Sequence, residues 1–167
     1  MQIPSELLSK IDEAISHYPV SKRSASLPLL HLFQEYFGYI SEDAIPWIAE
    51  KLGLQPINIL ELVTFYPMFR RTPAGKHHIR VCRTLSCALA GSAELKEKLC
   101  AATGMPCDGH GVHAHGDPIT VSPDGKFSIE FVECLASCGT GPVCMVDDDF
   151  YEAVTAAEIP QILSKYQ

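Results

Sequence analysis

The sequence has no run of apolar residues approaching the roughly 20 that cross a bilayer, so we expect no direct membrane insertion. Its first ten residues, MQIPSELLSK, lack the basic and then apolar segments of a secretory signal. Basic residues are also scarce: 13 Lys and Arg stand against 20 Asp and Glu, a formal net charge of -7. Because no basic stripe could neutralise phosphates, we expect no nucleic-acid partner. These absences favour a reducing compartment such as the cytoplasm.

Cysteine, by contrast, is plentiful for a chain of 167 residues. There are seven cysteines, an odd number. In a reducing compartment, clustered cysteines serve metal or redox chemistry more often than a disulfide framework.

The hydrophobic pattern divides the chain into two predicted domains, residues 1–72 and 73–167. The first is expected to be a small helical bundle, and a polar, turn-rich stretch at residues 70–75 marks the boundary. Its helices are expected to begin at a Ser5 cap, to run from Leu27 to Phe37 before Gly38, to begin at a Ser41 cap with an interruption at Pro46, and to begin at Pro56.

The second domain is expected to be an α/β sandwich rather than an all-β domain. The predicted strands are His77–Cys82, Ile119–Val121, Phe127–Val132, Val143–Val146 and Phe150–Val154, and the predicted helices are Ala93–Ala102, capped by Ser92, and Ala156–Lys165. A solvated turn is expected at residues 147–149. Cys100 and Cys144 lie on predicted elements between apolar neighbours, which favours a place in the core.

A long loop is expected at residues 104–118, which contain four glycines and three histidines. With Cys107, the histidines His110, His113 and His115 could bind a transition metal weakly. A solvated loop without a ligand explains the same residues.

Four cysteines form two spaced pairs, each directly after a predicted strand. Four residues separate Cys82 from Cys87, three separate Cys134 from Cys138, and 46 residues lie between the pairs. Two strand-end loops at one edge of a sheet can converge, and four thiolates are what a [2Fe–2S] cluster requires. Four thiolates would also satisfy a structural zinc ion, and buried free cysteines are a third reading.

The segments around these pairs resemble a known family. VCRTLSC at residues 81–87, VECLASCG at 132–139, VDD at 146–148 and TFYPMF at 64–69 are similar to motifs of the NuoE-type subunit of respiratory complex I, the NADH:quinone oxidoreductase. The resemblance covers nearly the whole length. It implies a helical bundle followed by a thioredoxin-like [2Fe–2S] ferredoxin domain, with one cluster held by Cys82, Cys87, Cys134 and Cys138.

The resemblance also implies a division of labour in a cytoplasmic complex at the inner face of a bacterial membrane. A partner flavoprotein (NuoF-type) binds NADH and FMN, and this chain's cluster exchanges single electrons with that FMN. We expect no substrate site on this chain, which has no Gly-x-Gly-x-x-Gly between a strand and a helix. Similar subunits serve NAD-linked hydrogenases and formate dehydrogenases, so the resemblance does not decide the parent complex. A zinc-stapled interaction module is the alternative from a different class.

Overall fold

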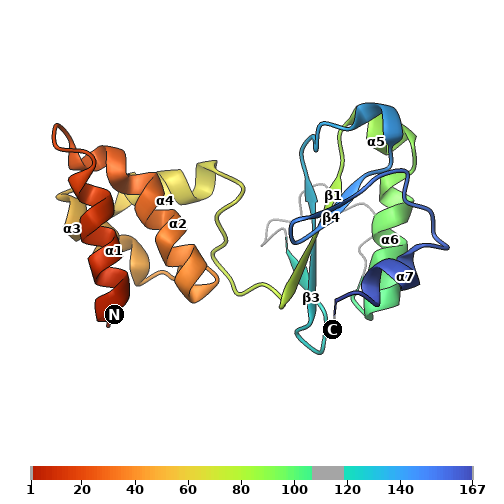
Figure 1. Cartoon of the computed structure of the whole chain (residues 1–167), viewed down its shortest axis with the longest axis horizontal. Helices are drawn as coiled ribbons and strands as arrows, with labels where there is room; N and C mark the ends of the chain where they lie inside the picture. The colour runs from red at the N-terminus through yellow and green to blue at the C-terminus, as the bar shows by residue number, and fades with distance from the viewer. Residues whose placement is uncertain (1, 107–118, 167) are drawn as a thin grey trace. The chain divides into compact units, whose positions relative to one another are not determined.

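The chain forms two compact units, Met1–Pro73 and Ala74–Gln167, in a computed structural model that describes residues 2–106 and 119–166 (Figure 1). Each unit has a hydrophobic core of its own. Cys107 and the three histidines His110, His113 and His115 lie outside the described residues, so the expected loop and its weak metal site stay predictions.

The N-terminal unit is helical, as the sequence predicts. Its elements are α1 (Ser5–Ser16), the 3-10 helix η1 (Lys22–Ala25), α2 (Ser26–Phe37), α3 (Ala44–Leu52) and α4 (Pro56–Phe65). Each α-helix buries at least one large apolar side chain completely: Ile11, Leu29, Ile48 and Ile59 have no measurable exposure. This shared core holds the bundle together. α2 ends at Gly38 as expected, because its φ of +81° suits glycine.

Two details of the bundle differ from the sequence prediction. Neither serine acts as a cap: Pro4 precedes α1, Asp43 precedes α3, and Ser5 is already helical. Pro46 does not interrupt α3. It occupies the third position of the helix, where the missing N–H would have had no acceptor within the helix.

The C-terminal unit is α/β, as predicted. Its elements are β1 (His77–Cys82), α5 (Leu85–Leu89), α6 (Ser92–Thr103), β2 (Thr120–Val121), β3 (Phe127–Val132), η2 (Cys138–Thr140), β4 (Cys144–Val146), β5 (Asp149–Tyr151) and α7 (Ile159–Leu163). The sheet has the order β2-β3-β1-β4-β5. β1 and β3 are parallel, and the other pairs are antiparallel. The central strands β1 and β3 thus carry the chain in one direction.

One face of this sheet packs against α6 and α7. Ile79 of β1, Ile129 of β3 and Leu99 of α6 are fully buried in one apolar cluster. Cys100 and Cys144 belong to the same cluster and are fully buried, which confirms their predicted place in the core.

Several element boundaries in this unit differ from prediction. α5 was expected to be a loop. Ser92 is not a cap but the first, buried residue of α6, and the residue before the helix is Gly91, in the left-handed conformation (φ +96°). β5 ends at Tyr151 rather than residue 154, and α7 begins at Ile159 rather than residue 156.

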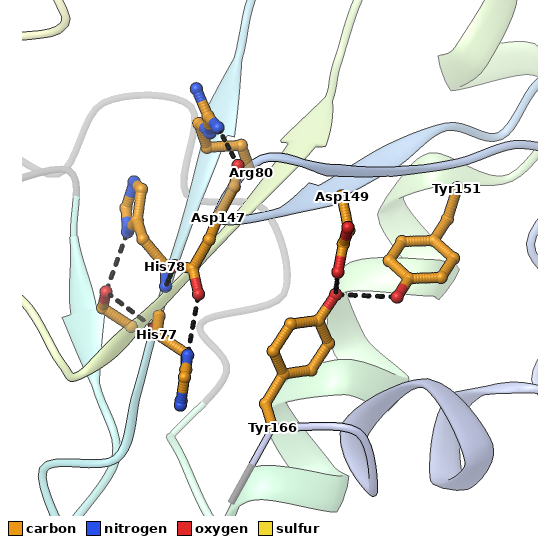
Figure 2. A network of polar contacts seen from close by, with 8 residues as sticks. His77, His78, Arg80, Asp147, Asp149, Tyr151 and Tyr166 are labelled. Atoms are coloured by element: carbon orange, nitrogen blue, oxygen red, sulfur yellow. Dashed lines mark hydrogen bonds and ion pairs between the residues drawn. The ribbon is translucent and has the colours of Figure 1, made fainter.

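Asp148 and Asp149 in the turn at residues 147–149 are exposed, as expected for a solvated turn, but two of its three carboxylates also form polar contacts. Figure 2 shows Asp147 and Asp149 in these contacts. Asp147 accepts hydrogen bonds from His77 Nδ1 (2.7 Å) and from the backbone N–H of His78 (2.8 Å). Asp149 accepts from the hydroxyl of Tyr166 (2.6 Å), which also contacts the Tyr151 hydroxyl (2.7 Å). The network ties the end of the chain to the sheet.

Candidate functional site

The four paired cysteines lie at the end of β1 or in the segments that follow β1 and β3. Cys82 is the last residue of β1, Cys87 lies in α5, Cys134 comes two residues after β3, and Cys138 begins η2. Since β1 and β3 are adjacent and parallel, with Cys82 opposite Val132, the chain leaves both strands at the same edge of the sheet. The two cysteine segments therefore converge there.

The four sulfurs are arranged as two pairs. Cys134 Sγ and Cys138 Sγ are 3.7 Å apart, and the thiols of Cys82 and Cys87 lie close enough for each to shift the pKa of the other. Two thiolates bound to one tetrahedral metal at about 2.3 Å lie about 3.8 Å apart. Among residues 2–106 and 119–166, no three His, Cys, Asp or Glu side chains gather as ligands of a single ion. The arrangement suits one metal per pair.

The two pairs differ in exposure. Cys82 and Cys87 are each 2% exposed and pack against the fully buried Val143, whereas Cys134 and Cys138 are exposed. A bound group would thus have an inner edge in the protein and an outer edge at the surface, where a partner can approach.

The sulfur of the first cysteine in each pair accepts hydrogen bonds. The backbone N–H of Ala136 donates to Cys134 Sγ (3.3 Å) and lowers the pKa of that thiol. Burial opposes ionisation of Cys82, but bonds from the Thr84 hydroxyl and the Leu135 N–H outweigh it, so its pKa is also lowered. Leu135 thereby links the second cysteine segment to the sulfur of the first. Thiolates are the form that binds metal.

The second cysteine of each pair has a raised pKa. Burial is the main cause at Cys87, and the neighbouring sulfur of Cys134 is the main cause at Cys138. Burial and repulsion between the sulfurs thus oppose the ionisation of all four thiols together, and the positive charge of bound metal ions would offset this. The donor set fits a metal–sulfur group.

An ion pair joins the two cysteine segments. Arg83 Nε donates to Glu133 Oε1 at 2.9 Å, and the guanidinium makes a second bond to the same oxygen. Both side chains are more than a third exposed, so the pair adds little stability. It does occupy the Glu133 carboxylate, which would otherwise be an unpaired charge next to Cys134.

A glycine allows η2 to approach α5 closely. A Cβ on Gly141 would lie 3.1 Å from Ala90 Cβ and 3.4 Å from Cys87 Sγ. The first distance is shorter than ordinary van der Waals contact, so a side chain at position 141 would displace α5, which carries Cys87.

Sequence reasoning missed Thr84, Arg83 and Glu152, which contact the cysteines or their segments. Thr84 and Arg83 lie between Cys82 and Cys87, so their place in the sequence could have indicated contact with the cysteines. Nothing in the sequence marked Glu152, which forms hydrogen bonds with the second cysteine segment.

Comparison with known proteins gives consistent similarities. Residues 11–167 match the model of the thioredoxin-like [2Fe-2S] ferredoxin family. The chain is 39% identical over 166 residues to a subunit of NADH-quinone oxidoreductase from Aquifex aeolicus, covering 99% of this chain and 96% of that protein. It is 38% identical over 156 residues to a subunit of NADH-quinone oxidoreductase from Thermus thermophilus, covering 92% of this chain and 80% of that protein.

A solved structure, that of air-oxidised NAD+-reducing [NiFe]-hydrogenase, is similar with a TM-score of 0.63 at 20% identity. The match covers 85% of this chain and 22% of the hydrogenase chain. At this identity the likeness speaks for the fold alone.

Proposed function

Because the chain belongs to the thioredoxin-like [2Fe-2S] ferredoxin family, we propose that it is an electron-carrying subunit of an NADH:quinone oxidoreductase. Family membership confirms the predicted fold class, a helical bundle followed by a thioredoxin-like α/β domain. The ligands we propose for its single [2Fe–2S] cluster are Cys82, Cys87, Cys134 and Cys138.

The observation that carries this proposal is the convergence of two thiol pairs at one edge of the sheet. Cys82 and Cys87 would hold the inner iron, and Cys134 and Cys138 the outer one. When bound, the cluster takes up and releases one electron at a time. The protein supplies N–H and hydroxyl hydrogen bonds to the sulfurs, which tune the potential of such a cluster.

The partner proposed for this site is a flavoprotein that binds NADH and FMN. The exposed pair Cys134 and Cys138 gives the cluster a surface from which electrons can cross to another protein. Beside Cys87, the α5 residues Leu85 and Leu89 are 75% and 82% exposed. Exposed apolar side chains next to a redox site favour a protein contact there.

The parent complex we favour is NADH:quinone oxidoreductase, because relatives with that name share 38–39% identity over most of the chain. An NAD-linked hydrogenase or formate dehydrogenase is the alternative, and the hydrogenase likeness fits it at the level of fold. No helix in the described part of the chain is long and apolar enough to span a membrane. We propose a place in the cytoplasmic arm of the complex.

Mixing experiments test the electron-transfer role. NADH alone should leave the visible spectrum of the oxidised chain unchanged, because NADH and FMN bind the partner. Adding a catalytic amount of the FMN-loaded flavoprotein subunit should then bleach the cluster. Bleaching by NADH without the flavoprotein would contradict the proposed division of labour, and no bleaching with it would contradict the partnership.

A further inference from the structure

The outer cysteine segment has little packing to hold it in place. Between Phe131 and Pro142, no side chain is buried, and Cys134, Cys138, Gly139 and Thr140 are exposed. Leu135 packs, partly buried, against Cys82, Cys87 and Val143, but the residues on both sides of Cys138 bury little apolar surface, so polar contacts contribute most of the support there. The site proposed above, on which this inference rests, needs those sulfurs held to within a fraction of an ångström.

One carboxylate oxygen of Glu152 is hydrogen-bonded to a residue on each side of Cys138 in the sequence. Glu152 Oε1 accepts a hydrogen bond from Thr140 Oγ1 (2.5 Å) and another from Ser137 Oγ. The two hydroxyls also contact each other at 2.7 Å. Glu152 therefore closes a ring of polar contacts around the turn that presents Cys138.

The backbone next to Glu152 supports the same turn. The N–H of Ala153 donates to the carbonyl of Thr140 (2.7 Å), and the N–H of Val154 donates to that of Pro142 (3.1 Å). The segment 152–154 is thus bonded to the outer cysteine segment through both side chain and backbone.

Within the part of the chain that the structure describes, no salt bridge neutralises the charge of Glu152. Among the described residues, the ion pairs include Glu133 with Arg83 but none that involves Glu152. Hydrogen bonds from Ser137 and Thr140 lower the pKa of the Glu152 carboxyl, so it is ionised at neutral pH. A fixed negative charge beside a cluster opposes the addition of an electron.

We propose that Glu152 is a positioning residue with two effects on the cluster. Its carboxylate oxygen braces the turn that carries Cys138, which slows loss of the outer iron. Its negative charge lowers the reduction potential of the cluster.

Two substitutions separate these effects. In Glu152→Gln the amide oxygen can still accept both hydroxyl hydrogen bonds, but the charge is gone. In Glu152→Ala both the acceptor and the charge are gone. Glu158→Gln is the matched control: Glu158 Oε2 likewise accepts from the hydroxyl of Thr155 (2.7 Å), beside α7, which lies toward the other end of α6 from α5 (Figure 1).

The measurements use the full chain carrying its cluster. The rate of cluster loss to an iron chelator is followed by visible absorbance, and the midpoint potential by an EPR-monitored redox titration. We expect Glu152→Ala to lose the cluster roughly tenfold faster than the unaltered chain, because an acceptor shared by two hydrogen bonds is lost. Glu152→Gln should lose it at close to the unaltered rate, and both variants should have a more positive potential. Glu158→Gln should match the unaltered chain in both.

Each part can be overturned separately. An unaltered rate of cluster loss in Glu152→Ala would overturn the bracing role, and so would an equal acceleration in Glu152→Gln. An unshifted potential in Glu152→Gln would overturn the effect of the charge. If the unaltered chain bound no [2Fe–2S] cluster at all, the proposed function itself would fail, an outcome distinct from these.

Discussion

At the scale of single residues, the cysteines differ in where their sulfurs lie. Cys82 and Cys134 follow the two parallel central strands and face a shared edge, whereas Cys144 is fully buried in the core. We predict that Cys82→Ala or Cys134→Ala abolishes the native cluster spectrum, because one iron loses a thiolate. Visible absorbance and iron content measure this.

Two control variants replace cysteines that are not proposed as ligands. Cys144→Ala and Cys107→Ala should both retain the cluster, the second as expected from the sequence for a residue outside the described part. Loss of the native spectrum in Cys107→Ala would show that the proposed set of four ligands is wrong.

The core thiol of Cys144 makes a separate prediction about pH. Burial raises its pKa from 9.0 to about 12. Between these values the unfolded chain has released the proton while the folded chain still holds it, so stability falls as pH rises from about 9 to 12 and is unaffected below. By pH 11 the loss from this group is about 2–3 kcal/mol.

Cys144→Ala should remove that dependence. We expect the variant to differ from the unaltered chain by a constant free energy of unfolding below pH 9, and the difference to shrink above it. Denaturant unfolding at pH 7, 9 and 11 provides the measurement. If the difference in unfolding free energy between the two proteins stayed constant up to pH 11, the raised pKa of Cys144 would be contradicted.

At the scale of secondary structure, the chain passes close to the backbone of β3 at Gly75, two residues before β1 begins. A Cβ on Gly75 would lie 2.4 Å from the carbonyl carbon of Phe127. Gly75→Ala must therefore displace the segment that leads into β1 from the start of β3, and we predict a loss of about 1–3 kcal/mol in the free energy of unfolding. A Cβ on Gly139 meets nothing within 4 Å, so Gly139→Ala is the control. Equal stability of the two variants would contradict this packing.

The short helix α5 carries a prediction about binding. Leu89 is 82% exposed next to Cys87, and replacing it by Glu places a charge where we propose the flavoprotein docks. We predict at least roughly tenfold weaker binding of the flavoprotein subunit, measured by calorimetry, with an unchanged cluster spectrum. Val20→Glu, at a residue 99% exposed in the other unit, is the control. Unaltered binding by the Leu89 variant would exclude α5 from the contact.

Which elements the sequence predicts depends on how local their signals are. β1 and β3 were predicted with the observed ends, because His77–Cys82 alternates like a strand and Phe127–Val132 is rich in strand-forming side chains. α5 was missed because five residues are too few for a helical period to be visible. Pro46 was misjudged because its effect depends on its position within the helix.

At the scale of the whole molecule, every cysteine of the site, together with the residues that hydrogen-bond to those cysteines, belongs to the unit Ala74–Gln167. We therefore predict that a fragment of residues 74–167 folds alone and binds the cluster with the spectrum of the full chain. Expression of the fragment, with circular dichroism and visible spectra, is the test. A fragment that is unfolded or colourless while the full chain is red-brown would show that the helical unit is needed.

The site was predictable from the sequence only in part. Paired spacing after two predicted strands pointed to the four cysteines, because parallel neighbours end at one edge. Glu152 was not predictable, since it lies 12 residues from Thr140 and 15 from Ser137 and meets them only through the fold. The proposed partner surface was not predictable either, because the sequence does not show that the leucines of α5 are exposed in the fold.

The most direct test of the cluster is metal analysis of the full chain purified without oxygen, combined with EPR after reduction. We predict a red-brown protein with about two irons and two acid-labile sulfides per chain, and an EPR signal from one reduced [2Fe–2S] cluster. A colourless protein with one zinc per chain would contradict the central claim and support a structural zinc module instead.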